Sequence, residues 1–209
     1  MLWIILGLVV SYLVGSIPTA YILGRLIKHK DLRQFGSHNV GATNAFRVLG
    51  KGIGIAVLFI DIIKGIIPVV MISDYIILKN NVPSGEIIRV ILGVAGACGH
   101  NWTVFLNFKG GKGVAVTFGV LIGLVIKYSS LRMVFVCVLG VWVVSFVISR
   151  MVSFASILSS LAFPVCMLLF KQERVFLIMS IVLSVFIIYR HKPNIKRLLA
   201  GKEPRLFKI

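Results

Sequence analysis

The strongest constraint on the fold is a series of long apolar runs separated by short basic connectors. The chain is 58% hydrophobic and only 14% charged, whereas soluble domains average roughly 45–50% apolar and 25% charged residues. Most runs approach the roughly 20 residues that cross a bilayer as a helix. The predicted spans lie near residues 2–24, 53–72, 87–106, 114–126, 133–149, 152–170 and 175–189. We expect an all-α, polytopic transmembrane bundle of seven spans, forming one integral membrane domain over residues 1–209.

Two of these apolar runs, the first and the fourth, differ from an ordinary transmembrane span. The first could be mistaken for a signal peptide, but it lacks a basic leading segment and is too long, so we interpret it as a retained span. The fourth supplies only 13 apolar residues, or about 20 Å of helix. We therefore expect it to begin inside the preceding glycine turn and to let Lys127 snorkel at its other end.

Positive charge sets the expected orientation. With the N-terminus outside and the C-terminus cytoplasmic, 16 of the 23 lysines and arginines fall in inner connectors and the tail, six fall outside, and Lys64 lies within the second span. This asymmetry satisfies the positive-inside rule. The net charge of +17 suits anionic lipid or phosphorylated substrates. It does not indicate nucleic acid, because the basic residues are scattered and no nucleic-acid-binding signature appears.

The turn over Phe108–Thr117 joins two apolar runs and carries two lysines and three glycines within five residues, Lys109–Gly113. Backbone N–H groups can converge on an anion where glycines remove side chains, and a following helix adds its positive end. Two interpretations have about equal weight: an anion site, and a basic loop that only fixes orientation. A Walker A loop is excluded because Leu106 and Gly113 stand where that motif needs glycine and Ser or Thr.

The longest inner connector, residues 28–51, mixes polar and apolar residues. Such backbone cannot face lipid, so we expect it to pack into the protein or line a wet cavity. Its candidate phosphate-binding side chains are Ser37, Asn39, Thr43, Asn44 and Arg47. The alternative is a helix that starts at Ala45 with Thr43 or Asn44 as its N-cap, which would explain one or two of these residues.

Charged and histidine side chains also occur near the spans. Asp61 and Lys64 lie three residues apart on one helix face, which predicts an ion pair, with a role for Lys64 in an inner cavity as the alternative. His100 is interpreted as packed, because it has no partners at metal-ligand spacing. Cys98, Cys137 and Cys166 stand singly in apolar runs and indicate neither disulfides nor zinc.

Two further inner segments carry candidate polar groups. The link after Arg150 has Ser153 and Ser156 at helical spacing, and the tail contains His191 and Asn194 on either side of Pro193. These side chains could contact an anion. The alternative for the tail is a basic segment that binds anionic lipid.

With these motifs assembled, the chain resembles the bacterial acyl-phosphate-dependent glycerol-3-phosphate acyltransferases over nearly its full length. The motifs, in order, are GSIPTAYILGR at 15–25, GSHNVGATNAFRVLGK at 36–51, DIIKG at 61–65, GHNWTVFLNFKGGKGVAVTFG at 99–119, RMVSFASI at 150–157 and HKPNIKRLLAGKE at 191–203. His38 stands where the family commonly has glycine, and Val116 interrupts the usual GGKGVAT. The first departure bears on the local loop conformation, because a φ specific to glycine is not available to histidine.

The resemblance implies an enzyme of the bacterial inner membrane with its active site at the cytoplasmic face. It would transfer a fatty acyl group from acyl phosphate to position 1 of glycerol 3-phosphate, giving lysophosphatidic acid and phosphate. The enzyme that forms the acyl phosphate is a candidate partner, and no cofactor or metal is expected. The implied functional residues are Ser37 and Arg47 of the first motif, Gly110, Gly111 and Lys112 of the glycine turn, Ser153 of the link, and His191 and Asn194 of the tail.

The implied chemistry needs positive charge more than a strong nucleophile, because an acyl phosphate is already activated. Lys112, Arg47 and the turn amides are expected to hold phosphate and the developing oxyanion. Direct attack by the glycerol hydroxyl is favoured, with His191 or a phosphate oxygen of the donor as the proton acceptor. A transporter of phosphate esters and a non-catalytic scaffold are the rival interpretations.

Overall fold

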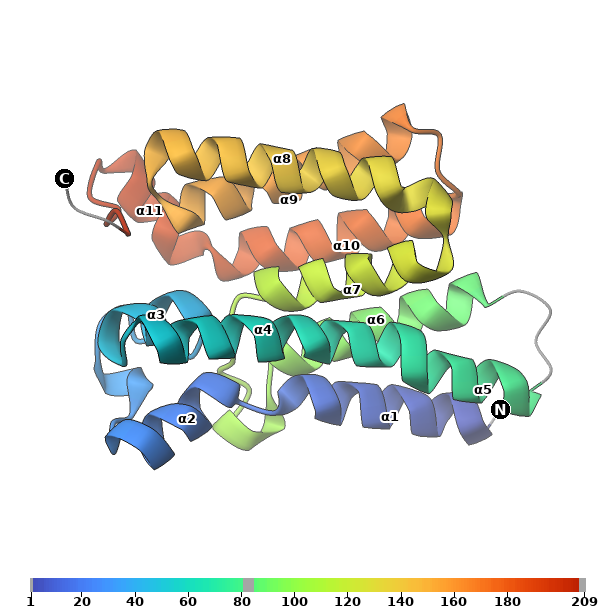
Figure 1. The fold of residues 1–209 in the computed structure, drawn as a ribbon, viewed down its shortest axis with the longest axis horizontal. Helices are drawn as coiled ribbons and strands as arrows, with labels where there is room; N and C mark the ends of the chain where they lie inside the picture. Colours follow the sequence, from blue (N-terminus) through green and yellow to red (C-terminus); the bar gives the residue numbers. More distant parts are fainter. Residues whose placement is uncertain (1, 81–84, 207–209) are drawn as a thin grey trace. The chain divides into compact units, whose positions relative to one another are not determined.

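The computed structural model describes residues 2–80 and 85–206, and within these ranges the ordered elements are all helical. The chain falls into two compact units, residues 1–127 and 128–209 (Figure 1). The first contains α1 (Leu2–Ser16), α2 (Thr19–Lys28), α3 (Ala42–Val48), α4 (Lys51–Ile67), α5 (Ser73–Asn80), α6 (Glu86–Asn101) and α7 (Val114–Lys127). The second contains α8 (Arg132–Ser149), α9 (Val152–Leu169), α10 (Arg174–Arg190) and α11 (Lys192–Leu199).

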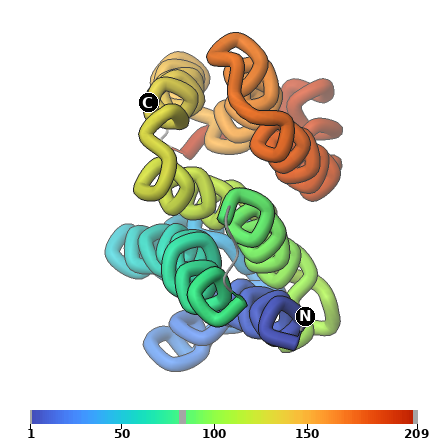
Figure 2. The backbone as a smooth tube through the Cα atoms, turned by 90° about the vertical axis from the view of Figure 1, so that its right-hand side faces the viewer, coloured from blue at the N-terminus to red at the C-terminus, as the bar shows by residue number. Residues whose placement is uncertain are grey.

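Small residues bring the helices of the first unit close together. The main helix pairs are α1 with α6 and α4 with α7 (Figure 2). A Cβ atom at Gly15 would overlap the backbone carbonyl of Gly96 on α6, and one at Gly119 would overlap that of Ile62 on α4. Glycine at these positions lets the backbones touch, as is common between helices in lipid.

In the second unit, α9 packs against both α8 and α10. Buried serines line this contact, and Ser184 of α10 donates a hydrogen bond to the Ser160 carbonyl of α9 at 2.6 Å. Hydrogen-bonded serines satisfy their polar groups inside the helix bundle.

Prolines interrupt two of the spanning segments. Pro18 separates α1 from α2, and Pro68 begins a π-helical segment, Pro68–Ile72, that joins α4 to α5. Proline lacks an N–H group and leaves backbone carbonyls without helical partners. After Pro68, the Pro68 carbonyl accepts from Ser73 Oγ at 2.7 Å and the Val69 carbonyl accepts from Arg89 at 2.8 Å. The Ser73 N–H also donates to the Pro68 carbonyl, so the π-helical segment is bound by side chains as well as by its own backbone.

Five helical segments are long and apolar enough to cross a membrane, and a sixth is reached if α10 and α11, which meet at a 62° bend, are taken as one broken span. The remaining apolar helix, α7, has only 14 residues. It begins at Val114, directly after the glycine-rich segment Lys109–Gly113, so the expectation that it starts within that segment is wrong. Lys127 at its end is bound to Asp74 at 2.6 Å.

Candidate active site

The connector over residues 28–51 in the first unit is organised around one buried amide. The Asn44 side chain donates hydrogen bonds to the carbonyls of Phe35 and Asn39, both at 3.0 Å, and a longer one of 3.3 Å to that of Leu32. Its Oδ1 accepts from the backbone N–H of Ser37 at 2.9 Å. The amide group is therefore occupied by the connector itself. Asn44 shapes the loop that presents Ser37 and does not offer its polar atoms to a ligand.

The sequence alternative of a cap at Thr43 or Asn44 is wrong. Helix α3 begins at Ala42, its N-cap residue is Gly41, and no side chain caps it. Arg47 lies in the last turn of this helix and is exposed, as is Ser37, while Asn39 and Thr43 are half-buried.

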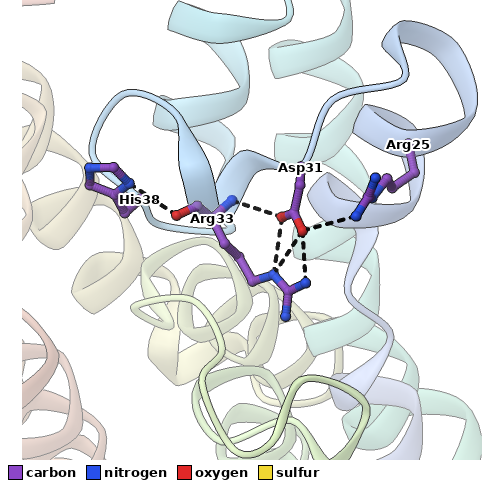
Figure 3. Close-up of polar contacts among 4 residues, drawn as sticks. All are labelled: Arg25, Asp31, Arg33 and His38. Atoms are coloured by element: carbon purple, nitrogen blue, oxygen red, sulfur yellow. Dashed lines mark hydrogen bonds and ion pairs between the residues drawn. The ribbon is translucent and has the colours of Figure 1, made fainter.

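A buried carboxylate anchors the beginning of the same connector. Asp31 is only 4% exposed and is bound to Arg33 at 2.7 Å and to Arg25 at 3.2 Å (Figure 3). The hydrogen bonds from Arg33 outweigh the effect of burial and lower the pKa of Asp31 from 3.8 to about 2. Both guanidinium groups also lie over the Tyr21 ring. This cluster fixes the chain between α2 and the Asn44 loop.

His38 adopts a left-handed backbone conformation, which favours glycine. Its φ is 58°, in the left-handed region, and its ring Nδ1 lies 3.0 Å from the Arg33 carbonyl (Figure 3). A local side-chain hydrogen bond of this kind can offset the cost of a left-handed residue. The loop therefore closes with histidine in place of glycine.

The glycine turn is held against the end of α6. The Gly110 N–H donates to the Asn101 carbonyl at 3.2 Å, and the Gly111 N–H donates to the His100 carbonyl at 3.0 Å. A Cβ atom at Gly110 would overlap the His100 carbonyl, and one at Gly111 would overlap the His100 ring. We expected these two amides to hold phosphate, but they are already bonded to α6. The glycines instead permit a close approach that places the half-buried Lys112 just before α7.

An ion pair lies inside the spanning helix α4, as predicted. Asp61 and Lys64 are 2% and 3% exposed, and their charged atoms are 2.6 Å apart. They line a small pocket with the Ser16–Thr19 segment, Val40, His100, Thr103 and the turn residues Gly110 and Gly111. His100 is buried, in agreement with its interpretation as a packed residue.

The second unit gathers its candidate residues around Glu203, which sequence reasoning did not single out. Ser153 Oγ and Asn194 Nδ2 both donate to Glu203 Oε1 at 2.6 Å, and Arg197 Nε donates to Oε2 at 2.7 Å. Burial alone would raise the pKa of Glu203, but hydrogen bonds from Ser153, Arg197 and Asn194 lower it below its usual value. The sequence feature that could have pointed to Glu203 is that it is a single carboxylate within a basic tail.

His191 joins α10 to α11 and is buried. Its Nδ1 lies 2.8 Å from the Ile187 carbonyl. A carbonyl can only accept a hydrogen bond, so Nδ1 carries the proton. Nε2 is then the ring nitrogen that can take up a proton. Across both units, the described residues contain no group of three His, Cys, Asp or Glu that could hold a metal ion.

Comparison with known proteins identifies the family. The model of the glycerol-3-phosphate acyltransferase family matches residues 5–201. The chain belongs to this family. A glycerol-3-phosphate acyltransferase of Gloeobacter violaceus is 40% identical over 94% of this chain and 91% of its own length. One of Macrococcus caseolyticus is 39% identical over 97% of both chains.

Solved structures of similar proteins support the same family assignment. The crystal structure of PlsY, an integral membrane glycerol 3-phosphate acyltransferase in its glycerol 3-phosphate form, matches with a TM-score of 0.85 and 37% identity, over 98% of this chain and 96% of that chain. A second PlsY structure, in a lysophosphatidic acid form, matches with a TM-score of 0.80 and 35% identity, over 97% and 94%. The protein is thus a multi-pass membrane acyltransferase of lipid biosynthesis.

Proposed function

We propose that the protein transfers a fatty acyl group from an acyl phosphate to the 1-hydroxyl of glycerol 3-phosphate, releasing lysophosphatidic acid and inorganic phosphate. Family membership supports glycerol 3-phosphate as the acyl acceptor, because the relatives are named glycerol-3-phosphate acyltransferases. The excess of Lys and Arg in the inner segments supports a site for two anionic reactants. The enzyme that makes the acyl phosphate is a proposed partner.

The proposed site uses cations from two segments of the first unit. Arg47 and Lys112 bind the phosphate groups, and Ser37, held by Asn44, donates a hydrogen bond to one of them. Asn39 and Thr43 line the same loop. Gly110 and Gly111 act by bringing the turn against α6, so the developing oxyanion is stabilised by Lys112 and Arg47 and not by their amides.

In the second unit, taken by itself, Ser153 and Asn194 are the proposed functional residues that contact Glu203. Ser153 and Asn194 are held in fixed orientations by this carboxylate, which suits positioning of a polar reactant. His191 is one candidate proton acceptor, through Nε2, and a phosphate oxygen of the donor is the other.

In the proposed reaction, the 1-hydroxyl oxygen of glycerol 3-phosphate attacks the acyl carbonyl carbon. The new ester C–O bond forms, the bond from the acyl carbon to the phosphate oxygen breaks, and phosphate leaves with that electron pair. The hydroxyl proton goes to the acceptor. Because the donor is activated, no acyl-serine intermediate is required.

We further propose a single domain of seven spans in the bacterial inner membrane, with the N-terminus outside, the C-terminus cytoplasmic and the site at the cytoplasmic face. This count adds α7 and α10 to the five long segments. The short α7 carries the glycine turn at its N-terminal end, and local thinning or tilting accommodates its length.

A donor comparison tests the proposed function. Purified protein is incubated with glycerol 3-phosphate and either palmitoyl phosphate or palmitoyl coenzyme A, and phosphate and lysophosphatidic acid are measured. We expect product only with palmitoyl phosphate, in equal amounts of lipid and phosphate. Product only with the coenzyme A ester would contradict the proposed donor. Unmodified glycerol 3-phosphate accumulating in proteoliposomes, without lipid product, would favour a transporter.

A further inference from the structure

The Asp61–Lys64 pair is unusual because both charges are buried in a spanning helix, with each side chain at most 4% exposed. Removing two charges from water costs several kcal/mol per ion before their attraction offsets it. Apolar residues at the same positions would hold α4 in lipid at least as well. Helix insertion alone therefore does not account for the pair.

Lys64 connects α4 to the break in the first span. Its Nζ donates to the Ile17 carbonyl at 2.7 Å, directly before Pro18. The neighbouring Ser16 carbonyl accepts from Thr103 Oγ1 at 2.6 Å. Two carbonyls at the break are thus bound by side chains from α4 and from the segment after α6. The ammonium group fixes the position of this backbone relative to α4.

Asp61 faces the end of α6 that supports the glycine turn. Its Oδ1 lies 3.9 Å from His100 Nδ1. The other side of His100 meets the turn: its carbonyl accepts from the Gly111 N–H, and its ring occupies the space that a Cβ atom at Gly111 would need. The charge pair, His100 and both turn glycines line one pocket. A continuous set of contacts therefore runs from the α4 charges to the residue before Lys112.

We propose that Asp61 and Lys64 are positioning residues for the glycine turn. They fix the position of His100, which contacts Gly111. They thereby determine where Lys112 contacts the phosphate of glycerol 3-phosphate. This inference rests on the proposed function for its ligand. The rival account is that the pair serves only the packing of α4, and the two accounts differ in what a neutral pair would do.

The test compares single and double neutral variants. Lys64→Met and Asp61→Asn each leave one buried charge without its partner, so both should lower the melting temperature in detergent. The double variant Asp61→Asn/Lys64→Met removes both charges, so its melting temperature should be higher than that of either single variant. Its KM for glycerol 3-phosphate should nevertheless rise on the order of tenfold or more, with a much smaller change in the KM for acyl phosphate.

A matched control lies at the opposite end of α7. Lys127 and Asp74 form another ion pair at 2.6 Å in the same unit, about 20 Å of helix away from the turn. The variant Asp74→Asn/Lys127→Met should leave both KM values near those of the wild type. A double variant at positions 61 and 64 with wild-type KM for glycerol 3-phosphate would overturn the inference.

A binding measurement separates this inference from the proposed reaction. Glycerol 3-phosphate should raise the melting temperature of the wild type, and the 61/64 double variant should need on the order of tenfold more of it for the same shift. A wild type that shows the shift but no acyl transfer would refute the reaction while leaving the positioning role supported. Equal shifts in both proteins, or none in the wild type, would refute the positioning role.

Discussion

The glycine turn of the first unit and the tail of the second unit are built by opposite means. The turn is held by backbone hydrogen bonds to α6 and by close contact with His100. The tail is held by one carboxylate, Glu203, which binds Ser153, Asn194 and Arg197. The geometry of the turn thus depends on missing side-chain atoms, and that of the tail depends on a charge.

Because of this contrast, the turn should be sensitive to added side-chain volume, and the tail should be sensitive to the loss of a charge. Adding one methyl group to the turn forces the backbone apart, because a carbonyl oxygen already occupies the space. Replacing the tail carboxylate by an amide keeps its shape but weakens three hydrogen bonds, of which the one from Arg197 is between opposite charges. The two regions should therefore respond differently to substitutions of similar size.

The largest effect is expected for Gly110→Ala. The new Cβ would overlap the His100 carbonyl oxygen, and this backbone atom can move only if the end of α6 moves. Displacing Lys112 from the phosphate should reduce kcat/KM on the order of a hundredfold or more. This loss of kcat/KM is measured by phosphate release with palmitoyl phosphate as the donor.

Gly140→Ala is the matched control, because nothing lies within 4 Å of a Cβ atom at that position of α8. It should retain wild-type activity and stability. Equal activity of the Gly110→Ala variant and this control would show that the turn does not need its close contact.

A smaller loss is expected for Glu203→Gln. The amide can still accept from Ser153 or Asn194, but it gives up the ionic bond with Arg197 and presents an N–H group where only acceptors fit. We expect a stability loss of about 1–3 kcal/mol, seen as a lower melting temperature. Activity measured well below that temperature should fall on the order of tenfold through misplacement of Asn194 and Ser153.

Glu173→Gln, a change of the same chemistry at the exposed start of α10, serves as the control and should behave like the wild type. If the two variants have the same melting temperature, the charge on Glu203 does not hold the tail.

Asn44→Ala should have a moderate effect on the first inner connector. It leaves the Ser37 N–H and the carbonyls of Phe35 and Asn39 without their buried partner, at a cost of about 1–3 kcal/mol. Because the loop is then less ordered, we expect faster amide hydrogen exchange over residues 35–44. Exchange rates equal to those of the wild type would show that the loop is ordered by other contacts.

The smallest effect is expected at Asp31 and depends on pH. The pKa of this carboxyl is about 2 in the folded protein against 3.8 as its ordinary value, so its ionised form stabilises the fold above pH 4. That contribution should be lost as the pH falls from about 4 to about 2. The melting temperature of Asp31→Asn should therefore lie below that of the wild type at pH 6, with the difference shrinking across that range.

The sequence predicted much of the helical fold, because apolar run length directly reports helices that cross a bilayer. It also predicted the Asp61–Lys64 pair from its spacing. The glycine turn shows where such reasoning stops: glycine can expose an amide to a ligand or let two backbones touch, and the neighbour that decides, His100, is known only from the fold. The hydrogen bonds of Asn44 and the contacts of Glu203 could not be predicted from the sequence, because their partners are carbonyls and side chains that loop closure brings near.

The most direct test of the account is phosphate release by Lys112→Ala and Arg47→Ala, each with palmitoyl phosphate and glycerol 3-phosphate. Both side chains are proposed to bind the reacting phosphates, so each variant should lose activity by on the order of a hundredfold to a thousandfold. Full activity in both variants would contradict the proposed site.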